Sequence, residues 1–310
     1  MTESNRTALI LLSDKRSGST MVQDELCRHP DIARVNYSSH TYFETQHWLK
    51  AAALLDRPGA LYSGGKTYPA YSSKATARRY MIDTINGNLS EFKIPSSNRE
   101  LAFSGWQNLC DEFAKPVFFE KSPQYPANWG ALSLLMEWAE KAPMQVKYLF
   151  LFRNPQAVQY SAEKLFRTPP RMRQFGWLEA QRNLLACQAM ISQNQQMSIR
   201  YEEIVKNPRE MFAKICDFTG VSSDASLGEN VSAGSLDKWK NDPGFTLKLD
   251  PSVAQLANAL GYTNDELDNP NGVAGDVNDN RSVSVRASHF MSRAHHEVLR
   301  PIKMWLANRK

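Results

Sequence analysis

A loop near the N-terminus has the residue types of an anion-binding site. Residues 13–20 read Ser-Asp-Lys-Arg-Ser-Gly-Ser-Thr, between an apolar run at 8–12 and a helical pattern. The run predicts a buried strand. The small residues Ser17, Gly18 and Ser19 let the backbone curl, so that N–H groups converge at the helix N-terminus. We therefore expect the loop to bind an anion.

The same loop differs from the phosphate loop of nucleoside triphosphate hydrolases. That motif needs two glycines with a lysine after the second, whereas Lys15 and Arg16 both precede the single Gly18. Triphosphate hydrolysis is therefore disfavoured. Taken alone, small polar residues at this position are also compatible with an ordinary turn.

A second cationic motif follows another apolar run, at residues 146–152. Arg153 comes directly after it, Asn154 is a natural helix N-cap and Pro155 a natural first helical residue. We expect Arg153 at the carboxyl end of a strand, with Ser161 on the second turn of the helix that follows. A guanidinium supplies a forked pair of donors and a hydroxyl a third, which suits a phosphate.

Together these segments resemble the motifs by which sulfotransferases hold 3′-phosphoadenosine 5′-phosphosulfate (PAPS). The loop, with a His-Pro-Asp helix end at residues 29–31, is similar to the segment that grips the 5′ side of PAPS. Arg153 and Ser161 match the 3′-phosphate motif. Residues 118–125 resemble the Glu-Lys-Ser/Thr-x-x-Tyr block of the heparan-type branch.

Two further blocks extend the resemblance over residues 8–220. Residues 36–44 resemble the Ser-Ser-x-Thr segment of heparan N-sulfotransferases, whose proposed catalytic base falls on Glu44 without gaps. Residues 200–203 resemble a Tyr-Glu strand end common in sulfotransferases. The resemblance implies an α/β protein with a P-loop-like sulfotransferase fold, a central, mostly parallel sheet flanked by helices.

The implied reaction is in-line transfer of the sulfuryl group of PAPS to a hydroxyl or amine. It releases adenosine 3′,5′-bisphosphate and requires no metal. The resemblance gives Glu44 the role of general base, while Arg16 and Lys121 neutralise the leaving side. His40 is the competing base and is ranked second, because a neutral imidazole suits proton transfer near pH 7.

Eleven residues on these motifs are assigned to the cosubstrate. Whether Lys15 or Arg16 faces the phosphosulfate stays open. Arg167 could instead be a solvated residue near a helix end, and Lys238, in a basic segment resembling the late loop that closes over PAPS, could be solvated. The assigned residues are Lys15, Arg16, Ser17, Gly18, Ser19, Thr20, Arg153, Ser161, Arg167, Tyr201 and Lys238.

The chain pattern predicts one domain over residues 1–310, with a PAPS-binding core at about 8–220. Residues 50–110 and 222–286 are predicted additions that shape an acceptor pocket or lid, although 264–279 could be a plain surface connection. A C-terminal helix is expected at 287–310. The predicted strands are 8–12, 32–36, 116–120, 146–152 and 197–201.

Composition and charge limit the classes of molecule that the protein is expected to bind. A net charge of +5 suits an anionic cosubstrate, but the cations are dispersed, so nucleic-acid binding is not expected. The four cysteines form no metal-ligand or CxxC spacing. The polar first residues and the lack of a membrane-length apolar run predict a cytoplasmic protein. The acceptor is expected to be a small molecule or a carbohydrate. A nucleotide-dependent kinase and a non-catalytic nucleotide- or partner-binding module stay as alternatives.

Overall fold

The core of the molecule is a five-stranded parallel sheet. A computed structural model describes residues 6–59, 73–167, 169–232, 234 and 236–273. All strand pairs are parallel, and the strand order is β2-β3-β1-β4-β5. The expected fold class is therefore confirmed. The strands are β1 (Thr7–Leu12), β2 (Ile32–Ala33), β3 (Val117–Lys121), β4 (Gln145–Phe152) and β5 (Gln196–Arg200).

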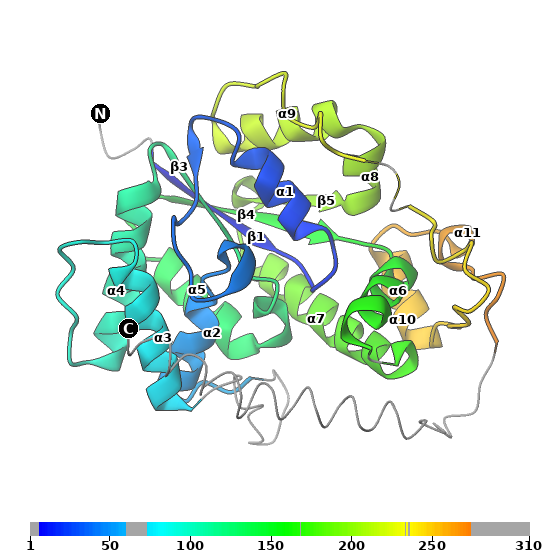
Figure 1. Ribbon diagram of the computed structural model, residues 1–310, viewed down its shortest axis with the longest axis horizontal. Coiled ribbons are helices and arrows are strands. Elements are labelled where there is room, and N and C mark those ends of the chain that lie inside the picture. The colour runs from blue at the N-terminus through cyan, green and yellow to red at the C-terminus, as the bar shows by residue number, and fades with distance from the viewer. Residues whose placement is uncertain (1–5, 60–72, 168, 233, 235, 274–310) are drawn as a thin grey trace, which may run out of the picture.

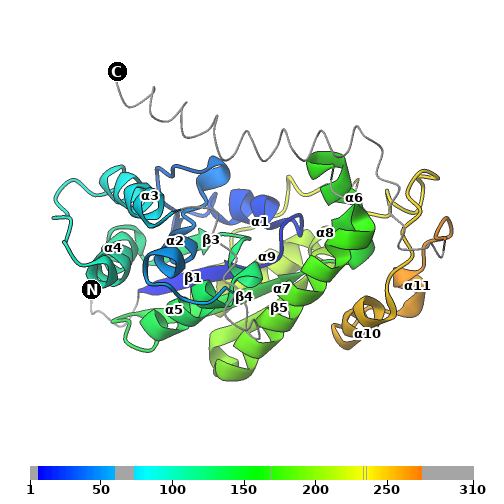
Figure 2. The same ribbon diagram turned by 90° about the horizontal axis from the view of Figure 1, so that it is seen from below.

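Helices cover both faces of this sheet, as Figure 1 shows. One face carries α1 (Ser19–Leu26), α8 (Tyr201–Lys206) and α9 (Pro208–Thr219). The other carries α2 (His47–Leu54), α3 (Lys74–Asn86), α4 (Asn98–Phe113), α5 (Trp129–Ala139) and α7 (Pro170–Met190). Figure 2 shows a third group beside the sheet: α6 (Pro155–Phe166), α10 (Pro251–Ala259) and α11 (Asn264–Leu267). The short helices are η2 (Thr41–Phe43), η3 (Tyr125–Ala127) and η4 (Gln193–Gln195).

The central strands are buried on both faces, which explains their continuous apolar sequence. In β1, Ile10 packs with the α2–α5 side, whereas Leu9 and Leu11 pack against α1, α8 and α9. Successive side chains of a strand point to opposite faces. The same alternation places Glu120 and Lys121, the last two residues of β3, on opposite faces of the sheet.

The carboxyl end of β1 is a switch point of the topology. The helix after β1 covers one face, whereas the chain after β3 and β4 reaches helices α5 and α7 on the other. Ligands in open parallel sheets bind where such connections diverge. The loop at 13–20, Lys121 and Arg153 all lie at this edge, as expected from the sequence.

The second predicted strand is wrong in length. Residues 32–36 were expected to pair, but β2 contains only Ile32–Ala33. The chain leaves the sheet because the N–H groups of Asn36 and Tyr37 donate to Asn88 Oδ1, just beyond α3, at 2.9 and 3.0 Å. This turn directs residues 38–46 across the carboxyl edge of the sheet.

Other expected helix ends are confirmed. The Asn154 side chain accepts the N–H of Gln156, and Pro155 is the first residue of α6. Gly220 ends α9 with φ 82°. Residues 222–273 include α10 and α11, while the predicted C-terminal helix lies outside the described residues. Within the described part of the chain, no helix has the length and apolar character needed to cross a membrane.

Candidate active site

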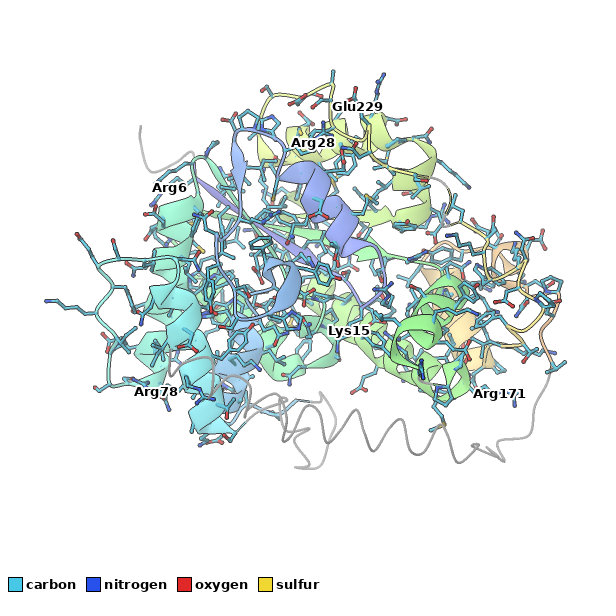
Figure 3. The ribbon with its side chains drawn as sticks, viewed as in Figure 1. Arg6, Lys15, Arg28, Arg78, Arg171 and Glu229 are labelled. Carbon is cyan, nitrogen blue, oxygen red and sulfur yellow. The ribbon has the colours of Figure 1, made fainter. Side chains whose placement is uncertain are left out.

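The loop after β1 is shaped by a glycine that no other residue replaces without strain. Gly18 has φ 94°, in the left-handed region that favours glycine. A Cβ there would lie 2.3 Å from Cδ2 of Tyr201, so any side chain at position 18 would clash with the ring of Tyr201. Ser17 next to it is fully buried, and its hydroxyl has no hydrogen-bond partner among the described atoms. Figure 3 marks the same loop by Lys15, where β1 approaches α6 and α7.

This packing predicts a selective effect of adding one methyl group. Gly18→Ala combines left-handed strain, about 1–2 kcal/mol, with a clash against Tyr201. Gly220→Ala is the matched control, because Gly220 has φ 82° and an added Cβ would have no atom within 4 Å. We expect thermal unfolding to show the larger loss for Gly18→Ala. Equal losses would mean that the Tyr201 contact adds nothing.

Arg153 joins the loop to the end of β4. Its Nη1 donates to the carbonyl oxygen of Arg16 at 2.8 Å, and its guanidinium carbon lies 4.2 Å from the ring centre of Tyr201. Burial lowers the pKa of Arg153, although Tyr201 and Glu202 oppose this. Nε is buried without a partner among the described atoms. The guanidinium is thus held in place while its Nε lacks an acceptor among the described atoms.

Arg16 and Ser161 meet directly. Arg16 Nε donates to Ser161 Oγ at 3.0 Å across the gap between the loop and α6. The arginine is exposed, and its backbone has φ 71°. The structure therefore brings together Arg16, Arg153 and Ser161, which lie on three different segments of the chain. Two guanidinium groups and a hydroxyl are the kinds of donor that phosphate and sulfate oxygens accept.

An ion pair behind the loop was not foreseen from the sequence. Arg173, in α7, donates to Asp14 Oδ2 through Nη1 and Nη2 at 3.3 and 3.2 Å, and to the carbonyl of Lys15 at 3.4 Å. These bonds fix the backbone that carries Lys15. The only sequence signal was the acidic residue two positions after a buried strand, because the distance along the chain hides the partner.

Lys121 lies at the centre of a second, buried group. Its side chain has no exposure, and Nζ lies 3.1 Å from Thr20 Oγ1 and 3.0 Å from Glu44 Oε1. Gln124 Nε2 donates to Glu44 Oε2 at 2.7 Å. Through Thr20, in the first turn of α1, this group adjoins the loop at residues 13–20. Gln124 was not selected from the sequence, although it belongs to the block at 118–125.

His40 touches the same carboxylate. Its Nδ1 lies 3.1 Å from Glu44 Oε2, and its side chain is 22% exposed against 6% for Glu44. Burial raises the pKa of Glu44, but the His40 hydrogen bond, the charge of Lys121 and the Gln124 bond outweigh it and bring the pKa to about 2. Glu44 is therefore ionised at neutral pH and holds a proton weakly.

Two of the predicted cosubstrate residues, Arg167 and Lys238, are exposed. Arg167 is exposed at the C-terminal end of α6, with φ 52°. Lys238 is exposed too, whereas its neighbour Lys240 lines a cavity of about 120 Å³ together with Arg153 and Glu202. Within the described residues, no three His, Cys, Asp or Glu side chains are grouped in a way that could hold a metal ion.

Comparisons with known proteins agree with the fold. A model of the sulfotransferase family matches residues 9–225, so the chain belongs to the sulfotransferase family. No curated protein sequence gives a significant match. The sulfotransferase domain of the Synechococcus PCC 7002 olefin synthase superposes with a TM-score of 0.57 and 20% identity, over 84% of this chain and 96% of that one.

The sulfotransferase domain from the curacin biosynthetic pathway is also similar. It gives a TM-score of 0.53 and 19% identity, over 84% of this chain and 99% of that chain. At such identities the likeness shows the fold alone. The coarse prediction of a sulfotransferase enzyme is confirmed by the family, whereas the roles of individual residues stay predictions.

Proposed function

We propose that this sulfotransferase uses PAPS and transfers its sulfuryl group to a hydroxyl or amine acceptor. The observation that carries the proposal is the meeting of Arg16, Arg153 and Ser161 at the loop, beside the buried Lys121–Glu44 pair. The first group suits the phosphates of the cosubstrate. The second suits the chemical step.

The residues present fit PAPS in a specific way. Buried polar atoms normally have hydrogen-bond partners, and Ser17 Oγ and Arg153 Nε are among the buried atoms of the described residues that have none. Both atoms belong to the segments assigned to the phosphates. Phosphate oxygens would supply the missing acceptors, with the first N–H groups of α1 adding donors on the 5′ side. Arg153 and Ser161 would hold the 3′-phosphate.

The chemical step needs a proton acceptor and a positive charge near the leaving oxygen. We assign the charge to Lys121 and Arg16 and the proton acceptor to the Glu44–His40 pair. Because Glu44 holds a proton weakly, we favour a shared role in which His40 Nε2 takes the proton while the Glu44 carboxylate holds Nδ1–H. The sequence alone ranked Glu44 first, and that ranking stays untested.

Two finer assignments are part of the proposal. The contact between Glu44 and Lys121 supports a likeness to the heparan-type branch, whose motifs contain both residues. The acceptor is proposed to be a small molecule or a carbohydrate. Residues from the additions at 50–110 approach the site: the Tyr80 hydroxyl donates to the carbonyl of Glu44 at 3.3 Å. This contact supports a single domain in which the additions shape the acceptor side.

Binding of the product distinguishes PAPS from simpler nucleotides. We expect adenosine 3′,5′-bisphosphate to bind more tightly than AMP, because Arg153 contributes a charge-assisted contact to the 3′-phosphate. Such a contact is worth about 1.5–3 kcal/mol, or roughly ten- to a hundredfold in affinity. Titration calorimetry with both nucleotides measures the difference. Arg153→Ala should reduce it to little or nothing.

The control for this measurement is Arg182→Ala, which removes an exposed arginine of α7. It should leave both affinities unchanged. Equal affinity of the parent protein for AMP and the bisphosphate would reject PAPS as the cosubstrate. If Arg153→Ala still binds the bisphosphate more tightly than AMP, other residues must bind the 3′-phosphate.

A further inference from the structure

Glu120, the neighbour of Lys121, holds three hydroxyl groups beneath the candidate active site. Its side chain is 1% exposed and lies on the face of β3 opposite to Lys121. Its Oε1 accepts hydrogen bonds from Ser122 Oγ at 2.6 Å, Thr45 Oγ1 at 2.8 Å and Tyr125 Oη at 3.2 Å. Three donors on one oxygen form a strong and direction-specific network.

Each of these hydroxyls also receives a backbone N–H from the start of α2. Gln46 N donates to Ser122 Oγ at 2.9 Å, while His47 N and Trp48 N donate to the hydroxyls of Thr45 and Tyr125 at 3.3 and 3.4 Å. The first N–H groups of a helix lack partners within the helix. Gln46, the N-cap of α2, provides no side-chain cap of its own.

Glu120 therefore caps α2 indirectly, through a layer of hydroxyls. The acidic group lies at the N-terminal, positive end of the helix, which favours this arrangement. The capped residues, Gln46 to Trp48, begin two positions after Glu44 in the chain. Consequently, the side chain of Glu44 is held by Lys121 on one face of β3, and the backbone that follows Glu44 is tied through hydroxyl groups to Glu120 on the other.

We propose that Glu120 is a positioning residue that sets the place of Glu44 through Thr45, Ser122 and Tyr125. The proposal rests on the proposed function, because it takes the Glu44 carboxylate as part of the chemical machinery. It assigns no contact with PAPS or acceptor to Glu120. Loss of the network lets the start of α2 loosen and moves the carboxylate away from Lys121 and His40.

Hydrogen exchange tests the network without any ligand. In Glu120→Gln, Thr45→Val and Ser122→Ala, we expect the amides of Gln46 to Trp48 to exchange about tenfold faster, the size of one lost hydrogen bond. The matched control is Thr219→Val, because the hydroxyl of Thr219 is also buried but donates to carbonyls of its own helix, α9. Unchanged exchange in all three network variants overturns the proposal.

Turnover measurements then distinguish a positioning role of Glu120 from a general contribution to stability. The readout is release of adenosine 3′,5′-bisphosphate from PAPS. Where no acceptor is known, water serves as the acceptor. We expect Thr45→Val and Glu120→Gln to lower kcat about tenfold while the bisphosphate binds as before. Added to Glu44→Gln, either change should have no further effect, because it acts through Glu44. Additive losses would show a merely structural role.

The outcome for the proposed function is read independently. If Glu44→Gln alone keeps full turnover, the assignment of the chemical machinery fails, whatever the exchange data give. If Glu44→Gln is inactive but the network variants exchange and turn over like the parent, only the positioning role fails. Thr45→Val keeps the test valid should Glu120→Gln not fold, because it removes a single hydroxyl and leaves the carboxylate in place.

Discussion

Glu44→Gln and His40→Asn each lower turnover by about 10²–10⁴-fold, the usual contribution of a general base. The reason is that the two side chains act as one unit, with Nδ1 of His40 3.1 Å from Oε2 of Glu44. Glutamine keeps the shape of Glu44 but carries no charge to stabilise a protonated imidazole. The double variant should be no slower than the slower single variant, since groups that act together are not additive.

Steady-state kinetics with PAPS measure turnover, and calorimetry with the bisphosphate measures nucleotide affinity. Nucleotide affinity should stay close to that of the parent. Glu25→Gln and His29→Asn are matched controls, because both residues are buried near the far end of α1 and should leave turnover unaffected. An active His40→Asn beside an inactive Glu44→Gln would make the carboxylate the direct base. The reverse result would assign the step to histidine alone.

Lys121→Met lowers turnover by about 10²–10³-fold, as expected for removal of one donor that stabilises developing charge. Methionine has a similar length but no charge at the position of Nζ, 3.0 Å from Glu44 and 3.1 Å from Thr20. Because the fully buried ammonium group touches the start of α1, the loss should be larger in kcat than in nucleotide affinity. A parental kcat would make the lysine structural.

The same substitution also has a stability cost that can be separated from catalysis. Breaking a buried ion pair from one side costs about 3–5 kcal/mol, because the other charge is left uncompensated. Lys121→Met with Glu44→Gln removes both charges and should recover much of the unfolding free energy. Denaturant unfolding measures the recovery. Turnover should stay low in the double variant. If turnover and unfolding free energy both recovered, the ion pair would serve stability alone.

Local patterns were sufficient to predict most of the sheet. The apolar runs before the loop and before Arg153 are β1 and β4, and Asn154 with Pro155 opens α6 as the sequence indicated. The length of β2 was not predictable, because the N–H groups of Asn36 and Tyr37 leave the sheet for a side chain about fifty positions later. Local propensity carries no information about such a partner.

In the candidate site, too, some residues could be predicted from local sequence, whereas others depend on partners far along the chain. Glu44 and Lys121 were selected from separate blocks and meet in the structure at 3.0 Å. Gln124 and Arg173 were missed, because an amide and an arginine on a helix resemble many solvated residues until their buried partners are known. Glu120 was seen only as part of a motif, since its role depends on how hydroxyls from two segments surround it.

The proposed activity of this protein is transfer of the sulfuryl group of PAPS to an acceptor. Mass spectrometry of reactions containing PAPS and a panel of alcohols, amines and carbohydrates tests it most directly. We expect a sulfated product formed together with adenosine 3′,5′-bisphosphate, and both formed far more slowly by Lys121→Met. Tight binding of the bisphosphate with no sulfated product across the panel, and no release of bisphosphate from PAPS, would contradict it and favour a non-catalytic nucleotide-binding role.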